Sequence, residues 1–242
     1  MSGGFVFPTG AATHVGCVRK VNEDSVLARP GAGIWAVADG MGGYGGGDVA
    51  SQAIVAALAR IEPRESAADL LGDFERAVVA VNAELRARAK GPDAIALGAT
   101  LVALLAHGAH WACVWCGDSR AYLRRDGALT QVSRDHSEVQ ELIDRGVLSE
   151  EEALTWPRRN VVTRALGAAD KAELDLVDGP LHAGDRFLLC SDGLTAHVTN
   201  PEIAALLAAG PPQEACDGLL QMTLARGAKD NVSIVVVDCA AE

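Results

Sequence analysis

Apolar residues fall into short continuous runs in some parts of the chain and into stripes of helical period in others. The short runs predict β-strands at residues 25–29, 34–38, 100–106, 110–116, 121–125, 129–132, 186–190 and 232–237. The stripes predict helices at residues 48–61, 66–90, 137–145, 201–209 and 213–225, and Ser149 with Glu152 has the spacing of a capping box for a further short helix. The strands cluster apart from the helices, which favours an α+β fold of antiparallel sheets over a doubly wound parallel sheet.

Glycine-containing pairs mark turns between these elements. The strands expected between residues 100 and 132 follow one another closely and predict an antiparallel meander whose last turn is Asp126-Gly127. Asp178-Gly179 is interpreted as a plain turn as well, because Asp-Gly is a common turn signal. Gly91-Pro92 is expected to end the long second helix.

Composition limits the classes of function. The chain has 242 residues, 49% of them hydrophobic, and we expect one domain over residues 1–242 with a full-sized core. A net charge of −11 and an aromatic content of 4% argue against nucleic-acid binding, because such a surface repels a phosphate backbone and offers few rings for base stacking. Residues 1–16 lack a secretory signal and no apolar run reaches 18 residues, so we expect a cytoplasmic protein without membrane insertion.

Six cysteines are spread thinly along the chain, and we expect them to be reduced. Cys113 and Cys116 form a C-x-x-C pair, but strand geometry would point them to opposite faces. Since no second pair of ligands completes a zinc site, both are predicted to be core residues.

Four aspartates stand at the edges of apolar runs, namely Asp39, Asp118, Asp192 and Asp230. Strand ends are rigid, so carboxylates placed there can converge on one point, and they repel one another unless a cation lies among them. Oxygen ligands of this kind suit Mg²⁺ or Mn²⁺ better than zinc. Each aspartate taken alone is more often a turn residue, so spacing by itself leaves the metal site open.

Longer phrases of sequence are more specific than single aspartates. In chain order they are Gly16-Cys17-Val18-Arg19-Lys20-Val21-Asn22-Glu23-Asp24-Ser25, Asp39-Gly40-Met41-Gly42-Gly43, Gly98-Ala99-Thr100, Gly117-Asp118-Ser119-Arg120, Asp135-His136-Ser137, Thr163-Arg164-Ala165-Leu166-Gly167, Cys190-Ser191-Asp192-Gly193-Leu194 and Asp230-Asn231-Val232-Ser233. Together they closely resemble the bacterial branch of the PP2C (PPM) family of metal-dependent protein serine/threonine phosphatases, over about residues 13–238.

The resemblance implies an αββα sandwich, in which two antiparallel β-sheets are flanked by helices and a two-metal centre lies in a cleft at one end. The metal ligands that it implies are Asp39, which bridges both ions, Gly40 through its carbonyl, Asp192 and Asp230 at the first ion, Glu23 near the second, and Asp118 at a third ion seen in bacterial members. Arg19 matches the arginine that grips substrate phosphate, so Arg19 and Asp39 are the expected catalytic residues.

The mechanism implied by the resemblance is hydrolysis of phosphoserine and phosphothreonine by water activated between two Mn²⁺ or Mg²⁺ ions, without a covalent phosphoenzyme. The ions would reverse the sign of the local field so that a phosphomonoester dianion is attracted. Residues 144–160 would form a flap beside the cleft. The expected partners are phosphorylated proteins and a cognate bacterial Ser/Thr kinase, with a role in type VI secretion control as a weaker expectation; we expect a monomer.

Three positions depart from the family pattern. Asp48 replaces the usual glutamate after Gly47, and the other two leave the proton donor to the leaving group open. Tyr44 stands where bacterial relatives usually have histidine, and Trp156 precedes Pro157 where a histidine is common. Either Tyr44 replaces that histidine or metal-bound water serves as the donor. His136 is interpreted as a hydrogen-bonded structural residue rather than a catalytic one.

Two alternative functions compete with the phosphatase interpretation. Gly40-x-Gly42-x-x-Gly45 matches a dinucleotide-binding fingerprint, but a second parallel strand should follow the helix, and residues 61–65 are charged and contain a proline. A catalytically silent relative that binds phosphoproteins is the other alternative. The intact Asp39, Asp118, Asp192 and Asp230 argue against it, because a decayed site is expected to lose ligands.

Overall fold

The computed structural model describes residues 4–42, 46–88, 97–208 and 210–242. Its strands are β1 (Phe5–Val6), β2 (Thr9–His14), β3 (Asp24–Arg29), β4 (Ile34–Met41), β5 (Gly98–Ala99), β6 (Leu101–His107), β7 (His110–Cys116), β8 (Arg120–Arg125), β9 (Ala128–Gln131), β10 (Asp175–Pro180), β11 (Arg186–Cys190), β12 (Val232–Asp238) and β13 (Ala240–Ala241). Its helices are η1 (Pro30–Ala32), α1 (Gly47–Leu58), α2 (Ala67–Arg88), α3 (Glu138–Asp144), α4 (Glu150–Ala153), α5 (Asp192–Thr195), α6 (Asn200–Leu206) and α7 (Pro212–Ala225).

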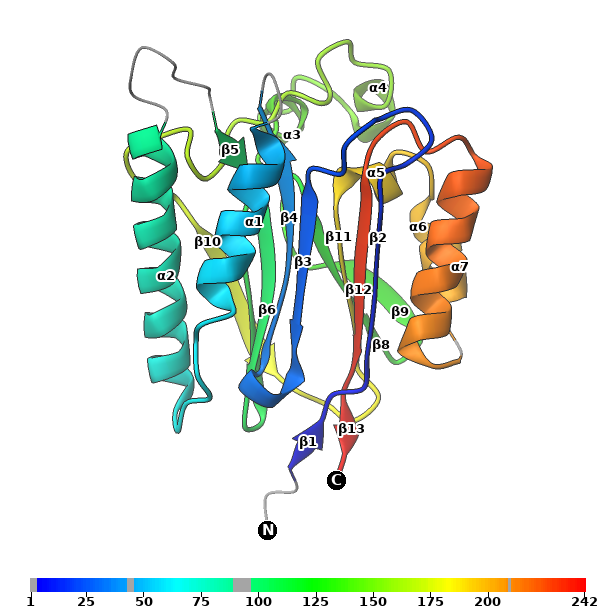
Figure 1. Ribbon diagram of the computed structural model, residues 1–242. Helices are drawn as coiled ribbons and strands as arrows, with labels where there is room; N and C mark the ends of the chain where they lie inside the picture. Colours follow the sequence, from blue (N-terminus) through cyan, green and yellow to red (C-terminus); the bar gives the residue numbers. More distant parts are fainter. Residues whose placement is uncertain (1–3, 43–45, 89–96, 209) are drawn as a thin grey trace.

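Two sheets face each other with helices on their outer sides (Figure 1). The first sheet has the order β10-β7-β6-β4-β3, with β5 added beside β4, and the second has the order β2-β12-β11-β8-β9. All strand pairings within the described ranges are antiparallel. The predicted αββα sandwich is therefore confirmed, and the parallel sheet required by the dinucleotide-binding alternative does not occur in this part of the chain.

The apolar strands are buried on both faces because each sheet packs against helices on one side and against the other sheet on the other. In β4, Ile34 and Ala36 face the layer of α1 and α2, whereas Trp35 and Val37 face the second sheet. Residues of β12 divide in the same way between the inter-sheet core and the layer of α6 and α7. This two-sided burial explains why the central strands read as continuous apolar runs and not as alternating ones.

Most predicted elements lie within one to three residues of the observed ones, including the Ser149–Glu152 capping box that starts α4. Asp126-Gly127 forms the predicted turn between β8 and β9, with φ angles of 52° and 83°. The predicted ends of two helices, at residues 90 and 209, and the Gly91-Pro92 stop lie outside the described residues.

The predicted meander and one predicted turn are wrong. β7 pairs with β6 and β10, whereas β8 pairs with β9 and β11 in the other sheet, because the chain crosses between the sheets at residues 117–119. Asp178-Gly179 lies inside β10, where Gly179 stands opposite Trp111. A Cβ on Gly179 would lie 3.2 Å from the Trp111 ring, so this glycine gives the indole room instead of making a turn.

The two cysteines of the C-x-x-C pair are buried free thiols on opposite faces of β7, as predicted. Cys113 belongs to the inter-sheet core and Cys116 to the core beneath α1 and α2. Burial raises the pKa of Cys116 to about 12, so this thiol stays protonated at neutral pH.

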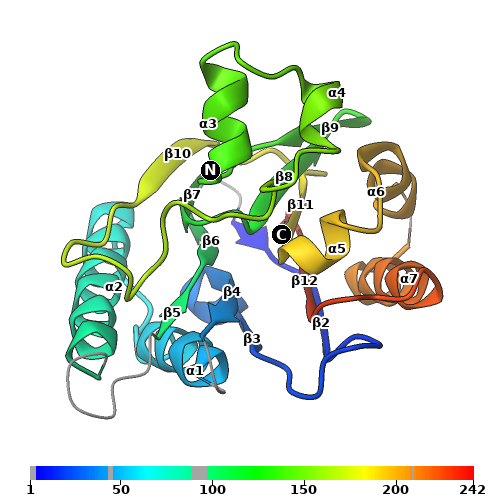
Figure 2. The ribbon, with the colours of Figure 1, turned by 90° about the horizontal axis from the view of Figure 1, so that it is seen from above.

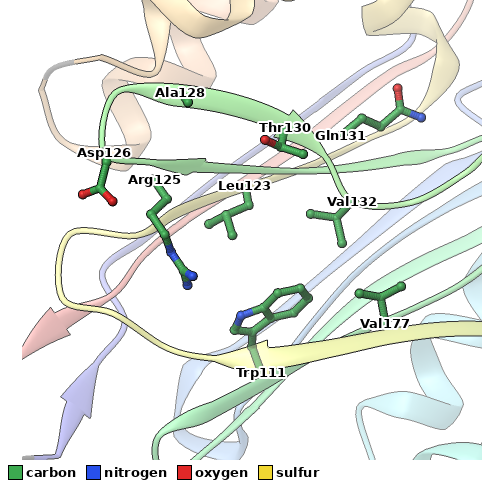
Figure 3. A pocket seen from close by; sticks show the side chains of 9 residues that line it. All are labelled: Trp111, Leu123, Arg125, Asp126, Ala128, Thr130, Gln131, Val132 and Val177. Carbon is green, nitrogen blue, oxygen red and sulfur yellow. The ribbon is translucent and has the colours of Figure 1, made fainter.

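The two sheets part at their β9 and β10 edges and leave a groove of about 600 Å³. Figure 3 shows its lining, in which Trp111, Leu123, Val132 and Val177 supply apolar side chains and Arg125 lies toward one end. The Arg125 guanidinium is paired with Asp185 and is held in place. This groove contains none of the aspartates predicted to bind metal. Along the residues that are described, no helix combines the length and apolar character needed to cross a bilayer.

Candidate metal centre

Five aspartates gather at one end of the sandwich, where strands of both sheets begin or end. They are Asp24 in β3, Asp39 in β4, Asp118 in the turn after β7, Asp192 at the start of α5 and Asp230 just before β12. Asp24 and Asp39 stand directly opposite each other across β3 and β4. Figure 2 looks down on this end and shows α5 beside β12, with α3 and α4 on one side and α7 on another. Asp39 lies inside β4, near its C-terminal end, and not after the strand as predicted.

Four carboxyls of this group, those of Asp24, Asp39, Asp118 and Asp192, have a raised pKa and are harder to ionise than an ordinary aspartate. Removal from water raises the pKa of Asp39, and the negative charges of Asp24, Asp192, Asp118 and Asp230 raise it further. Burial first, and then the charge of Asp192, raises the pKa of Asp118 to about 7, while burial is the main cause that raises the pKa of Asp24 to about 6. The five side chains are therefore within electrostatic reach of one another, and a cation among them would be strongly favoured.

The chemistry of this donor set fits a hard divalent cation. The gathered donors are carboxylate oxygens, and Oδ1 of Asp24 is buried without a hydrogen-bond partner in the described residues. In the same residues, no group of three or more His, Cys, Asp and Glu side chains is already arranged to hold an ion. The carboxylate of Asp230, for its part, is engaged by another partner.

Arg19 is the partner that engages Asp230. Its Nη2 donates to Oδ2 of Asp230 at 2.7 Å, and Oδ1 of Asp230 accepts the backbone N–H of Asn231 at 2.9 Å. The side chains of Arg19 and Asp230 are 53% and 44% exposed, so this ion pair is weakly held and open to exchange. The predicted phosphate ligand and one predicted metal ligand thus lie in direct contact.

Glu23 and Gly40 lie where α1 begins. Oε1 of Glu23 accepts the N–H of Gly47, the first residue of α1, at 3.1 Å, and the carboxylate thereby caps this helix. A Cβ on Gly40 would lie 2.1 Å from the carbonyl oxygen of Gly47 and 2.4 Å from that of Glu23. Gly40 therefore allows β4, the Glu23 backbone and α1 to approach one another closely.

Asn231 fixes the loop that carries Arg19. Its Oδ1 accepts the N–H of Glu23 at 2.8 Å, and its Nδ2 donates to the carbonyls of Val15 and Val21 at 2.9 and 3.0 Å. The amide side chain thus joins both ends of the loop to the start of β12. Arg19 and Asp230 are held near each other by this connection.

Two buried hydroxyls link Asp39 to the turn that carries Asp118. Thr100 Oγ1 accepts the N–H of Asp39 at 3.2 Å, and the N–H of Thr100 donates to the carbonyl of Asp39 at 2.8 Å. Thr100 Oγ1 also lies 2.7 Å from Oγ of Ser119. Because both side chains are 1% exposed, water does not compete for these bonds.

His136 is a buried, hydrogen-bonded residue, as predicted. Its Nδ1 accepts the N–H of Gly117 at 3.1 Å, and its ring stacks on Trp115 with a centroid distance of 6.2 Å. Trp156 lies in the segment after α4, and its indole N–H is buried with no acceptor among the residues described. Tyr44 lies outside the described residues, as do Gly43 and Gly45 of the glycine run.

Three polar residues of the site were not singled out from the sequence: Asp24, Thr100 and Asn231. Each stands inside one of the quoted phrases, and Asp24 and Asn231 directly follow Glu23 and Asp230, which is the signal that could have found them. Their roles depend on distant partners. Ser191, for example, donates to Asp24 Oδ2 at 2.8 Å across 167 residues of sequence.

The chain is similar in sequence to known protein phosphatases. Residues 18–211 match the sequence profile of the family described as protein phosphatase 2C. The serine/threonine protein phosphatase PstP of Mycobacterium tuberculosis is 43% identical over 94% of this chain, which spans 44% of that protein's length. The serine/threonine phosphatase stp of Listeria monocytogenes is 34% identical, with 93% of each chain covered.

Solved structures give the same result. The PstP catalytic domain in complex with two manganese ions superimposes with a TM-score of 0.89 at 40% identity, covering 98% of this chain and 99% of that one. PppA of Pseudomonas aeruginosa, described as a key regulatory component of the type VI secretion system, gives a TM-score of 0.89 at 41% identity, covering 97% and 98% of the two chains. Fold and sequence agree, and the chain belongs to the protein phosphatase 2C family.

Proposed function

We propose that this protein hydrolyses phosphoserine and phosphothreonine monoesters in proteins with divalent cations as cofactors. The observation that carries the proposal is the group of five aspartates at one end of a chain of this family, four of which have raised pKa values. The names of PstP and stp, both Ser/Thr phosphatases, support this substrate class.

The chain offers oxygen ligands for two or three ions. In this proposal Asp39, the Gly40 carbonyl, Asp192, Asp230 and Glu23 would hold two ions, and Asp118 would hold a third. When bound, the ions would attract a phosphate dianion and lower the pKa of a water molecule for in-line attack on phosphorus. Either Mn²⁺ or Mg²⁺ suits these ligands, and the manganese complex of PstP supports the former.

Arg19 is proposed to bind the substrate phosphate. Its guanidinium is exposed and already pairs with a carboxylate, so it can exchange Asp230 for phosphate oxygens of the same charge. The exchange would leave Asp230 free to turn toward the other aspartates. Arg19 would therefore neutralise charge on the phosphate while Asn231 keeps its loop in place.

A phosphatase assay of the whole chain tests the proposal. We expect release of phosphate from a phosphothreonine peptide with Mn²⁺ or Mg²⁺, and loss of that release with EDTA. Asp192→Asn should remove nearly all activity while the circular dichroism spectrum stays unchanged. Binding of the peptide without hydrolysis under every metal condition would refute the proposal and support the silent, phosphoprotein-binding alternative.

The biological setting is proposed from the same resemblance. A Ser/Thr kinase in the bacterial cytoplasm would supply the phosphorylated substrates, and similarity to PppA supports a role in type VI secretion control. We propose that the chain acts as a monomer. Phosphoproteomics after deletion of the gene should show increased Ser/Thr phosphorylation on the substrates, and no change would contradict this setting.

A further inference from the structure

His136 and Gly117 exchange two hydrogen bonds at the crossing between the sheets. The N–H of His136 donates to the carbonyl of Gly117 at 2.9 Å, and the N–H of Gly117 donates to Nδ1 of His136 at 3.1 Å. A backbone amide can only donate, so Nδ1 must present its lone pair and Nε2 carries the proton. Nε2 lies 3.2 Å from Oδ2 of Asp175, an acceptor suited to that proton, and 3.4 Å from Nη1 of Arg164, which donates to Oδ1 of the same Asp175 at 3.0 Å.

Gly117 directly precedes Asp118, and its position is tightly constrained. Its φ of 120° is outside the range that L side chains usually adopt. A Cβ at this position would lie 2.5 Å from Cβ of Thr100, so Gly117 is pressed against Thr100 on one side. The His136 ring holds its N–H on another side. Rotation of the Gly117 peptide, which would redirect Asp118, is therefore opposed by both contacts.

The turn that carries Asp118 is thus held from two directions. After Asp118, the hydroxyl of Ser119 shares a hydrogen bond with the hydroxyl of Thr100. Thr100 in turn accepts the N–H of Asp39 on its hydroxyl and donates its own N–H to the Asp39 carbonyl. Before Asp118, the bonds from His136 fix Gly117. His136 also accepts the N–H of Thr163 on its carbonyl at 2.8 Å, so its own backbone is anchored to a third segment.

We propose that His136 is a positioning residue for Asp118, acting as the neutral tautomer that accepts the Gly117 N–H. Through this bond it sets the direction of the Asp118 carboxylate and hence the affinity for the divalent ion that Asp118 would hold. The inference rests on the proposed function for the identity of that ion, but its test reads metal binding and not phosphate release. Removal of hydrogen-bond partners behind a metal ligand commonly weakens binding by about 10- to 100-fold.

Matched variants separate this role from simple packing. His136→Asn places an amide oxygen where Nδ1 lies and can still accept the Gly117 N–H. His136→Leu fills similar space against Trp115 without an acceptor. If the leucine variant does not fold, His136→Gln replaces it, because its amide reaches the place of Nε2 and leaves the Gly117 N–H without a partner.

The experiment is calorimetric titration of the metal-free full chain with Mn²⁺. The relevant binding is the part that Asp118→Asn removes from the wild-type isotherm. We expect His136→Leu to weaken that part by about 10- to 100-fold and to leave the remaining binding within about 3-fold. His136→Asn should restore it to within about 3-fold of wild type. In the Asp118→Asn background, His136→Leu should have no further effect on Mn²⁺ binding, because the two changes act on one site.

Several results would overturn the inference. Equal losses in the asparagine and leucine variants would show that packing, not the acceptor, matters. An equal effect of His136→Leu with and without Asp118 would show a general structural role. Absence of any Asp118-dependent Mn²⁺ binding in the wild type would refute both the inference and the proposed third ion. A protein with this binding pattern but no phosphatase activity would uphold the role of His136 and refute the proposed function.

Discussion

The dipeptide Asp-Gly stands at both ends of the second sheet, and its glycine serves a different purpose at each. Asp192-Gly193 starts α5 beside the Cys190–Arg120 end of the β8–β11 ladder, whereas Asp126-Gly127 turns the chain between β8 and β9 at the other end. A Cβ on Gly193 would lie 1.9 Å from the carbonyl oxygen of Asn231. A Cβ on Gly127 would meet nothing within 4 Å, but the residue has a φ of 83°. Position 193 requires glycine because the neighbouring Asn231 carbonyl leaves no room for a side chain, whereas position 127 requires it because its own φ angle is left-handed.

The aspartates of the two pairs also differ, in their burial and in the charges around them. Asp192 is partly buried, and its pKa is raised by burial first and by the charge of Asp230 second. Asp126 is exposed at the tip of a hairpin. The close approach permitted by Gly193 brings the start of α5 against the start of β12, which puts Asp192 near Asp230. The same dipeptide therefore contributes to the group of aspartates at one end and forms a solvent-exposed turn at the other.

The largest effect is expected from removing a charge at the acidic end. Asp39→Asn should lower Mn²⁺-dependent kcat/KM on a phosphothreonine peptide by about 1,000-fold or more, because Asp39 is central to the carboxylates that would hold the ions. The metal-free variant should melt no lower than the wild type, since the substitution removes a carboxyl that is costly to ionise in this cluster. Asp126→Asn is the control at the other end and should leave activity unchanged. Activity of Asp39→Asn within a few-fold of wild type would contradict the assignment.

The next effect concerns packing at Gly193. Gly193→Ala should destabilise the protein by about 3 kcal/mol, because the new methyl group meets a backbone carbonyl that cannot move independently of β12. Urea unfolding measures the loss. Gly31→Ala is a matched control, since a Cβ there meets nothing within 4 Å, and it should change stability by less than about 0.5 kcal/mol. Similar stability of the two variants would show that α5 can move away from β12.

The difference between Gly193 and Gly127 could not be predicted from the sequence, because it arises from Asn231, a partner distant in the chain. The central strands could be predicted because two-sided burial makes them continuously apolar. β2 and β10 could not, since Thr9–His14 and Asp175–Pro180 carry few apolar residues and owe their conformation to pairing with β12 and β7. Four aspartates of the site were found because each stands at the edge of an apolar run, whereas the role of Asp24 depends on its hydrogen bond from Ser191, which is distant in the sequence.

A smaller effect is expected from pH on the metal-free protein. The folded-state pKa of Asp118 is about 7 and that of Asp24 about 6, against an ordinary value of 3.8. Their stabilising protons are fully present below the ordinary value and are lost as pH rises through the folded-state values, so stability should fall between about pH 5 and pH 8. We expect a loss on the order of 2 kcal/mol in EDTA, measured by urea unfolding.

Asp118→Asn should reduce this pH dependence by removing one of the two titrating groups, and saturating Mn²⁺ should flatten it by binding the ionised carboxylates. Asp126→Asn should leave the slope as it is. Stability that rises from pH 5 to pH 8 without metal would mean that the carboxyls ionise easily in the folded state, and the electrostatic contrast between the two ends would then be wrong.

The smallest effect is expected at the hairpin. Gly127→Ala should cost about 1 kcal/mol, because a side chain in the left-handed region strains the backbone although nothing obstructs the methyl group. Gly127→Asn should cost less, since asparagine tolerates this conformation. Both variants should keep full Mn²⁺-dependent phosphatase activity. Urea unfolding and the peptide assay test this together: a loss as large as that of Gly193→Ala, or equal losses for alanine and asparagine, would show that Gly127 is also held by packing.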